Sequence, residues 1–339
     1  MKSHLVPQDG SPANTSTIAL SVSDQSEVPE WLRELYPYRT GTLPIGGYRL
    51  STVDEAPAET APGIPTFVLL HGNYTWSFLF RDLIGRLQQT CRVVAPDMIG
   101  FGLSEKPDAE AYHTLQQHVS NFTCLVDALE LRDITLVLHG WGGPIGLAYA
   151  CAQPQNVKAL VLTNTWAGIP PAIKTSRQPL GSRIAEWGRV GRRLDDWFNL
   201  SLHSAFAARS HRPVRDMALE AYSYPFHHHA SRAAIRAWSR MFAQPDEETL
   251  NALKGVETGL SRITAPVDLL YGSEDSLLSK LPAYMLRDSL KHAKEPVFLN
   301  ETGHFLPEEA PEALADFVLR TQQRGRPKHE KERMFRILP

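Results

Sequence analysis

ITLVLHGWGGPIGLAYA (residues 134–150) is the stretch of sequence that decides the fold. It starts with Ile134 to Leu138, which are apolar or β-branched and uncharged, as in a strand buried on both faces of a parallel sheet. The glycines that follow permit a sharp turn and a helix packed close to the strand, whose first N–H groups stay free to bind an anion. This layout is typical of a nucleophile elbow, whose central position usually carries Ser, Cys or Asp. The central residue here is Gly140, so the sequence predicts a scaffold for covalent catalysis without an attacking group.

Buried strands and amphipathic helices alternate on both sides of this stretch. Short runs of apolar or β-branched residues end in polar or glycine-rich loops, as the strands of a parallel sheet do. Their alternation with helical patterns predicts an α/β fold with a mainly parallel sheet that helices cover on both faces. The predicted buried strands are 65–70, 91–95, 134–138, 157–162, 267–271 and 297–299, and Gly47 to Val53 is predicted to be an edge strand.

The alternation stops between the strands at 157–162 and 267–271. The intervening residues show helical patterns interrupted by prolines, such as Arg183 to Leu200, and no convincing strand. An insertion at this point predicts a helical cap over the C-terminal ends of the strands, where ligands bind in open α/β sheets. The predicted divisions are a disordered leader (1–30), an α/β core (31–165 and 257–323), the helical cap (166–256) and a basic tail (324–339).

The composition of the chain limits its partners. Its 339 residues are 42% hydrophobic and 21% charged with a net charge of -2, so neither nucleic acid nor an acidic membrane surface is an expected partner. No apolar run in the N-terminal segment is long enough for a signal peptide or a membrane span. Cys91, Cys124 and Cys151 lack metal or redox spacing, which favours reduced, buried thiols in a cytoplasmic protein. We expect a small-molecule substrate, no metal and no cofactor; the sequence does not indicate an oligomeric state.

An acid and a histidine follow two further strand ends. Asp275 lies in the loop after the strand at 267–271, and His304 lies in the loop after 297–299. Because they follow the elbow in this order, they are predicted to form a catalytic dyad in which Asp275 holds one ring nitrogen of His304. The other ring nitrogen would take a proton from water or from the substrate.

Other polar residues near the strand ends are expected to have structural roles. Asp97 is expected to order the loop after its strand, and His71 is expected to be a hydrogen-bonded loop histidine. The run from His227 to His229 has no further ligand at metal spacing, so it is expected on a polar surface of the cap.

With these motifs in place, the chain resembles α/β-hydrolases of the haloalkane dehalogenase-like group. That group also includes epoxide hydrolases and the β-lactone decarboxylases of bacterial olefin synthesis. The resemblance covers about residues 36 to 321. It rests on HGNYTWSFLFR (71–81), VVAPDMIGFGLSEKP (93–107), LHGWGG (138–143), AYSYPF (221–226), SRAAIRAWSRMF (231–242), GSED (272–275) and TGHF (302–305).

The resemblance implies an α/β-hydrolase fold and a two-step reaction. The family carries Asp where this chain has Gly140, and that carboxylate displaces a leaving group to give an alkyl-enzyme ester. Water activated by His304 and Asp275 then cleaves the ester. Asn73 and Trp141 correspond to the residues whose N–H groups bind the departing anion and form the oxyanion hole. The acid matches the type found after the later strand, because the earlier alternative position, near Asn164, holds no carboxylate.

Three interpretations of Gly140 remain open. In the first, the His304–Asp275 dyad acts as a general base without a covalent step, in water addition, elimination, decarboxylation or cofactor-free oxygen chemistry on a small, largely apolar substrate. In the second, the chain is a catalytically silent binding or scaffold protein, for which the N-myc downstream-regulated family is a precedent. In the third, an Asp to Gly change has inactivated a dehalogenase or related hydrolase. The presence of Asp275, His304, Trp141 and Asn73 favours the first.

Overall fold

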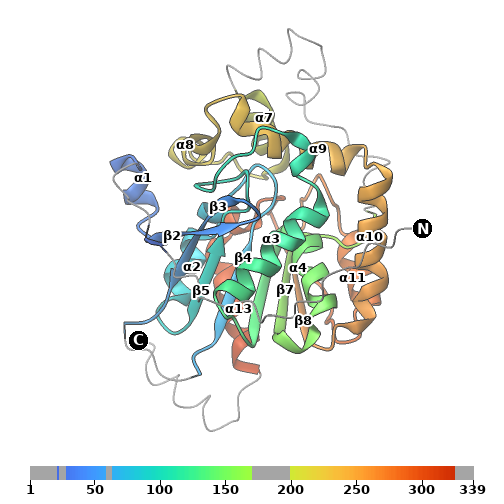
Figure 1. Cartoon of the computed structure of the whole chain (residues 1–339). Helices are drawn as coiled ribbons and strands as arrows, with labels where there is room; N and C mark the ends of the chain where they lie inside the picture. Colours follow the sequence, from blue (N-terminus) through green and yellow to red (C-terminus); the bar gives the residue numbers. More distant parts are fainter. Residues whose placement is uncertain (1–20, 23–27, 59–62, 170–198, 325–339) are drawn as a thin grey trace, which may run out of the picture.

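The computed structural model describes residues 21–22, 28–58, 63–169 and 199–324. Within them, nine strands form one sheet in the order β1-β2-β3-β5-β4-β6-β7-β8-β9 (Figure 1). All pairs from β5 to β9 in this order are parallel, and β1, β2 and β3 are antiparallel to their neighbours. The predicted, mainly parallel sheet is therefore confirmed. The strands are β1 Ser21–Val22, β2 Thr40–Ile45, β3 Tyr48–Glu55, β4 Thr66–Leu70, β5 Arg92–Pro96, β6 Ile134–Gly140, β7 Val157–Thr165, β8 Val267–Gly272 and β9 Val297–Leu299.

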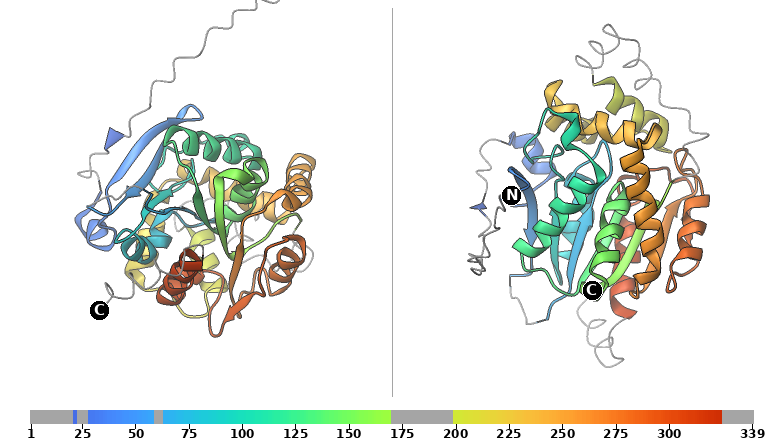
Figure 2. Two further views of the ribbon diagram at one scale, coloured as in Figure 1. Left: turned by 90° about the horizontal axis from the view of Figure 1, so that it is seen from below. Right: turned by 45° about the vertical axis from the view of Figure 1, so that its right-hand side comes forward.

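Helices cover both faces of the sheet (Figure 2). On one face α3 packs against α4, and α10 contacts both; on the other face α2 packs against α13. The α-helices are α1 Glu30–Leu35, α2 Arg81–Leu87, α3 Leu115–Ala128, α4 Gly142–Ala152, α7 Leu200–Arg209, α8 Asp216–Ser223, α9 Ala233–Ala243, α10 Glu247–Gly259, α11 Leu281–Ser289, α12 Leu306–Glu309 and α13 Pro311–Arg324. Short 3-10 helices are η2 Ser77–Phe80, η3 Glu110–Tyr112, η4 Pro154–Asn156, η6 Tyr224–Phe226, η7 Ala230–Arg232 and η8 Leu260–Arg262.

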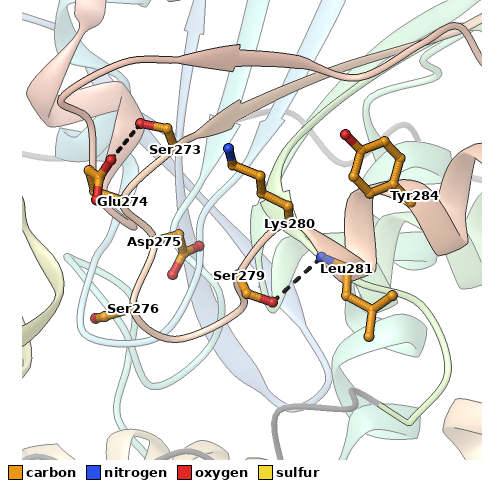
Figure 3. A pocket seen from close by; sticks show the side chains of 8 residues that line it. All are labelled: Ser273, Glu274, Asp275, Ser276, Ser279, Lys280, Leu281 and Tyr284. Carbon is orange, nitrogen blue, oxygen red and sulfur yellow. Dashed lines mark hydrogen bonds between the residues drawn. The ribbon is translucent and has the colours of Figure 1, made fainter.

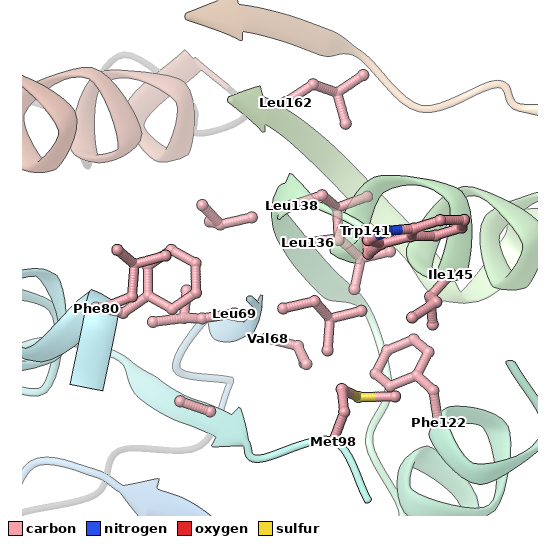
Figure 4. Packing of buried hydrophobic residues seen from close by; sticks show 14 of the residues in the cluster. Val68, Leu69, Phe80, Met98, Phe122, Leu136, Leu138, Trp141, Ile145 and Leu162 are labelled. Carbon is pink, nitrogen blue, oxygen red and sulfur yellow. The ribbon is translucent and has the colours of Figure 1, made fainter. Parts of the chain in front are cut away.

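The hydrophobic core lies between the sheet and these helices. Every residue of β6 is buried, which confirms that this strand is covered on both faces. Figure 4 shows strand residues packed against side chains of the neighbouring helices and loops. Each fully buried large apolar side chain contributes about 1.5–3 kcal/mol relative to exposure, so this core holds the strand ends in place. The residues labelled there are Val68, Leu69, Phe80, Met98, Phe122, Leu136, Leu138, Trp141, Ile145 and Leu162.

The turn from β6 into α4 depends on glycine at two positions. Gly140 has a φ of +54°, in the left-handed region that favours glycine. At Gly142 a Cβ atom would stand 2.3 Å from the backbone oxygen of Leu70. Because a backbone atom cannot be displaced as a side chain can, only glycine lets α4 begin this close to β4. The elbow geometry predicted for this stretch is therefore present.

The N-terminal part of the sheet differs from the prediction. The strand expected at Gly47 to Val53 is β3, but it is not an edge strand, because β2 pairs with it on one side and β5 on the other. Gly46 and Gly47, with φ of +60° and +84°, form the two-residue turn of a hairpin in which Ile45 pairs with Tyr48. A Gly-Gly pair between two strand-like runs is a hairpin signal, and it would have identified β2.

Two smaller expectations are also corrected. Ser21–Val22 pairs with β2, so the leader expected to be disordered over 1–30 contains a short strand; residues 1–20 and 23–27 lie outside the described part. Cys91 and Cys151 are buried as expected, but Cys124 is exposed. It lies on α3 off the buried face, which includes Asn121, Phe122 and Leu125. All three thiols are free.

The helices α7, α8 and α9, hereafter the cap helices, lie above the ends of the parallel strands (Figure 1). The next helix, α10, packs against α4 of the core, and the predicted cap boundary at residue 256 falls inside it. Most of the helix predicted at Arg183 to Leu200 lies outside the described residues, and so does most of the predicted basic tail. The division of the chain into core and cap stays a prediction. Among the described helices, none combines the length and hydrophobicity needed to cross a bilayer.

Candidate functional site

The predicted site residues lie at the carboxyl ends of parallel strands. Gly140 ends β6, Asn73 follows β4, and Asp275 follows β8. His304 follows β9, the outermost strand of the sheet. Parallel strands present their carboxyl ends at the same edge, so these residues can meet although more than 200 positions separate the first from the last.

His304 and Asp275 form a buried hydrogen-bonded pair. The Nδ1 atom of His304 lies 2.9 Å from Oδ2 of Asp275, and each residue is only 5% exposed. Because Asp275 is an acceptor, this bond places the proton on Nδ1 and leaves the lone pair of a neutral ring on Nε2. The two residues are therefore arranged as the predicted dyad, and Nε2 is the atom that can accept a proton.

Asp275 is held by four hydrogen-bond donors. Its Oδ1 accepts from the backbone N–H groups of Leu277 and Leu278 at 2.8 and 3.0 Å, and its Oδ2 accepts from the amide of Asn164 at 2.8 Å as well as from His304. Burial by itself raises the pKa of Asp275, but the charge of His304 and these hydrogen bonds lower it to about 2. The carboxylate is therefore ionised at neutral pH and fixed in orientation.

Asn164 has a role that the predicted site does not include. In the sequence it marks only the absence of a carboxylate, whereas in the structure its amide donates to Asp275 and its Oδ1 accepts from the backbone N–H of Gly272 at 3.2 Å. Asn164 has a φ of +41°, a conformation that Asn tolerates better than most residues. The available signal is an amide side chain shortly after the apolar run predicted at 157–162.

Gly140 faces the base of the dyad. A Cβ atom at this position would stand 4.0 Å from Nε2 of His304 and 3.1 Å from the Cα of Gly72. A side chain at position 140 would thus point between the base and the backbone after β4. The structure brings Gly140, His304 and Asp275 together, and the predicted catalytic roles of these residues stay predictions.

Indole rings surround the start of α4. The ring of Trp141 lies 5.2 Å from that of Trp166 and 5.8 Å from that of Trp238, measured between centroids. The N–H groups of Trp166 and Trp238 are buried without a hydrogen-bond partner among the described residues. Neither residue was singled out from the sequence, because one follows β7 and the other lies on α9, and only the fold brings them to Trp141.

The side chain of Asn73 is bound to a cap helix. Its amide nitrogen donates to the backbone oxygen of Ile235 at 3.2 Å and to Oγ of Ser239 at 3.0 Å, both on α9. These two bonds use both amide hydrogens, so the predicted donation from this side chain to an anion requires one of them to break. The backbone N–H of Asn73 is not affected, and the anion-binding role of Asn73 and Trp141 stays a prediction.

His139 is a further imidazole close to the dyad. Its ring centroid lies 5.1 Å from that of His304, and its Nδ1 lies 3.2 Å from the backbone oxygen of Thr163. Its Nε2 is buried and has no hydrogen-bond partner among the described residues. Burial, helped by the neighbouring His304, lowers the pKa of His139 to about 3, so this ring is neutral. His139 is not among the residues predicted for the site.

The C-terminal end of α7 accepts hydrogen bonds from both loops that carry the dyad. The backbone N–H of His304 donates to the oxygen of Arg209 at 2.8 Å, and Oγ of Ser276 donates to the oxygen of Ala208 at 2.9 Å. A Cβ at Gly303 would stand 2.4 Å from the Arg209 oxygen, so this approach requires glycine. A cap helix thus fixes the position of the base through the backbone.

The structural roles expected for two polar residues are confirmed. The carboxylate of Asp97 accepts from the backbone N–H groups of Ser77 and Leu103, both at 2.8 Å, and orders its loop. Nδ1 of His71 donates to the backbone oxygen of Gly72 at 2.8 Å, and Nε2 accepts from the N–H of Met98 at 3.0 Å.

Acidification is expected to destabilise the protein through His71. Burial lowers the pKa of His71 to about 4, from about 6.5 in an unfolded chain. Below pH 6.5 the unfolded chain binds a proton that the folded chain does not, so the free energy of unfolding falls as the pH falls towards 4. Between pH 7 and pH 5 this histidine alone should remove about 2 kcal/mol. Urea unfolding of the wild type and of His71→Gln at both pH values measures this change in the free energy of unfolding. The variant should lose less stability on acidification. An equal loss in both proteins would contradict the assignment.

The surface near the acid holds a pocket that is separate from the base. It has a volume of about 680 Å3, and neither His304 nor Gly140 lines it (Figure 3). The lining residues are Ser273, Glu274, Asp275, Ser276, Ser279, Lys280, Leu281 and Tyr284.

Possible metal ligands do not cluster in the described part of the chain. No group of three His, Cys, Asp or Glu side chains there could hold a metal ion. His227, His228 and His229 are exposed, as expected of a polar surface.

Comparison of sequences places the chain among known proteins. A family model for the alpha/beta hydrolase fold matches residues 65–311. The chain is 30% identical to the cis-3-alkyl-4-alkyloxetan-2-one decarboxylase of Shewanella oneidensis over 292 residues, which cover 85% of this chain and 89% of that protein. It is 31% identical to haloalkane dehalogenase 1 of Mycobacterium tuberculosis over 261 residues, which cover 76% and 84%.

Comparison of structures agrees with this placement. The haloalkane dehalogenase DbeA from Bradyrhizobium elkani superposes with a TM-score of 0.72 at 23% identity, covering 84% of this chain and 98% of that one, which shows a common fold. The haloalkane dehalogenase DatA from Agrobacterium tumefaciens superposes with a TM-score of 0.69 at 26% identity, covering 82% and 94%.

Proposed function

The chain belongs to the alpha/beta hydrolase fold family, among its haloalkane dehalogenase-like members, and we propose that it is an enzyme that uses no covalent intermediate. His304, oriented by Asp275, is the general base, and the substrate is a small, largely apolar molecule. The observation that carries the proposal is that Nε2 of His304, oriented by Asp275, faces Gly140, which has no side chain that could attack a substrate. The resemblance implies an Asp at this position, and its absence is part of the proposal.

The chemistry follows from these positions. A water molecule between Gly140 and His304 attacks an electrophilic carbon and transfers a proton to Nε2. The bond to the leaving group breaks, and the departing anion is stabilised by N–H groups of Trp141 and Asn73. The proton on Nε2 then passes to the product or to solvent. Positioned general bases contribute factors of about 100 to 10,000 to such steps.

No neighbouring side chain is placed to replace the missing nucleophile at position 140. The heavy atoms nearest to a Cβ at Gly140 are the Cα and N of Gly72 and Nε2 of His304, and none is a nucleophilic oxygen or sulfur. The names of the relatives point to small molecules with an electrophilic carbon, an oxetan-2-one or a haloalkane. We propose substrates of this kind, and a cytoplasmic location in keeping with the free thiols at 91, 124 and 151.

A single-turnover reaction in 18O-labelled water tests the proposed mechanism. Wild-type protein in excess is mixed with haloalkanes, epoxides, esters and β-lactones, and products are analysed by mass spectrometry. If water attacks directly, the first turnover carries 18O into the product, and the mass of the protein does not change. An unlabelled first product together with a protein adduct would refute direct attack. No conversion across the panel would support the alternative of a silent binding protein.

A further inference from the structure

His304 is held at its backbone as well as at its ring. Its N–H donates to the oxygen of Arg209 at the end of α7, at 2.8 Å. The preceding residue, Gly303, is bonded on both sides: its oxygen accepts from the amide of Asn164 at 3.3 Å, and its N–H donates to Oε2 of Glu309 at 3.0 Å. Glu309 therefore acts on the loop that carries the base from outside the dyad.

One oxygen of Glu309 joins this loop to the chain that follows α7. Oε2 accepts from the N–H of Gly303 at 3.0 Å and also from the N–H of His211 at 2.8 Å. His211 lies two residues after Arg209, whose oxygen binds the N–H of His304. The carboxylate thus closes a ring of hydrogen bonds between the two segments.

The backbone around Gly303 is tightly packed against the same groups. A Cβ there would stand 2.4 Å from the oxygen of Arg209, 2.6 Å from the nitrogen of His211 and 2.9 Å from Oε1 of Glu309. The first two are backbone atoms, which cannot turn aside as the end of a flexible side chain can. The approach of the two segments is therefore a fixed feature of the fold, and Glu309 is the side chain that bridges it.

Glu309 is itself placed by the residues next to the base. It ends α12, and its N–H donates to the oxygen of Phe305 at 3.0 Å. The ring of Phe305 stacks on that of Phe206 of α7, with 4.2 Å between centroids. The glutamate and the base thus lie on one short turn that is packed against α7.

The position of this turn decides where the free ring nitrogen of His304 stands. The imidazole is fixed at one end by its backbone and at the other by Asp275, 2.9 Å from Nδ1. A shift of the loop must therefore move Nε2 or stretch the bond to Asp275. A displacement of about 1 Å in a catalytic group can cost roughly 100-fold in rate.

From this geometry we propose that Glu309 is a positioning residue for His304. Its Oε2, bonded to the N–H groups of Gly303 and His211, locks the loop of the base to the chain after α7. The inference rests on the proposed function, in which His304 is the general base. It requires an oxygen that reaches both N–H groups, and it does not require a charge.

Substitutions at position 309 separate reach from charge. Glu309→Gln keeps the length of the side chain and an oxygen for both N–H groups, and it replaces Oε1, which has no hydrogen-bond partner in the described part of the chain. Glu309→Asp keeps the carboxylate but is shorter by one C–C bond, about 1.5 Å. Glu309→Ala removes both properties. Glu312→Ala is the matched control, because Glu312 is an exposed glutamate in the first turn of α13.

Turnover is measured on a substrate found in the panel of haloalkanes, epoxides, esters and β-lactones. In Glu309→Asp and Glu309→Ala, kcat should fall by about 10- to 100-fold with little change in KM, because a displaced base weakens the transition state more than substrate binding. Glu309→Gln and Glu312→Ala should stay close to the wild type.

The Nδ1 proton of His304 reports its position without any substrate. In full-length protein labelled with 15N-histidine, this proton lies buried against Asp275 and should exchange slowly with water. Its signal is identified by its loss in His304→Ala. Exchange should be faster by about tenfold or more in Glu309→Asp and Glu309→Ala, since local opening of the loop exposes the proton, and should stay slow in Glu309→Gln.

Urea unfolding of the same variants separates positioning from a purely structural role. A lower free energy of unfolding in Glu309→Ala with unchanged proton exchange and unchanged kcat would overturn the proposal. So would the opposite order, with Glu309→Asp like the wild type and Glu309→Gln impaired. If Glu309→Ala does not fold, the comparison of Glu309→Asp with Glu309→Gln decides by the same criteria. If no substrate of the panel is converted, the proposed function fails, whereas the exchange rates still decide whether Glu309 positions His304.

Discussion

Replacing His304 by alanine is expected to lower turnover by a factor of about 100 to 10,000, the usual contribution of a positioned general base. Its Nε2 is the one ring nitrogen of the dyad that Asp275 does not occupy, and it faces Gly140. Because no side chain at position 140 can attack the substrate, activation of water is the step that the base must support. Initial rates on a substrate found in the panel of haloalkanes, epoxides, esters and β-lactones measure the loss.

Two features make this experiment decisive. The backbone N–H of His304, bonded to Arg209, is kept in the variant, and Asp275 keeps three of its four donors, so the variant should fold. His228→Ala is a matched control, since that histidine is exposed on the surface near the cap helices and should leave the rate unchanged. Equal turnover in wild type and His304→Ala would rule out the dyad as the base.

Replacing Gly140 by aspartate is expected to create the covalent chemistry that the family pattern implies. A Cβ at this position points towards Nε2 of His304 at 4.0 Å, so the new carboxylate would lie beside the base that hydrolyses the ester. Halide release from a short bromoalkane should rise above the wild-type rate. The double variant Gly140→Asp with His304→Ala should accumulate the alkyl-enzyme, because its second step lacks a base. Intact mass spectrometry would detect this adduct.

The same substitution should cost stability. Gly140 has a φ of +54°, and its Cβ would stand 3.1 Å from the Cα of Gly72, so aspartate should destabilise the fold by about 1–3 kcal/mol. Gly140→Asn is the matched control, since it brings similar strain without a carboxylate nucleophile and should form no adduct and no additional halide relative to the wild type. If Gly140→Asp folds yet forms no adduct and releases no halide across the panel, the elbow is not the remnant of a covalent site.

The buried strands could be predicted from the sequence because they are mainly apolar. β4 and β6 contain no charged residue, and β7 and β8 contain one each, Lys158 and Asp268. All four begin within one residue of the predicted position. β2 contains a glycine and a proline, and its side chains do not alternate regularly, so only its Gly-Gly turn could have identified it.

The dyad could be predicted because its members follow such strands in a set order. Trp166 and Trp238 could not be, because their importance depends on which elements meet in space. The hydrogen bonds from Asn73 to α9 depend on how that helix packs over the core, which a local pattern does not contain.

The bonds between the end of α7 and the dyad loops bear on how such proteins can be recombined. Because Arg209 and Ala208 accept hydrogen bonds from residues 304 and 276, a chimera that exchanges this segment for that of a relative also exchanges part of the support of its base. The crossover point should therefore lie before Ala208, so that these residues stay with the loops they brace. Such a chimera would exchange cap residues while keeping the hydrogen bonds that position His304.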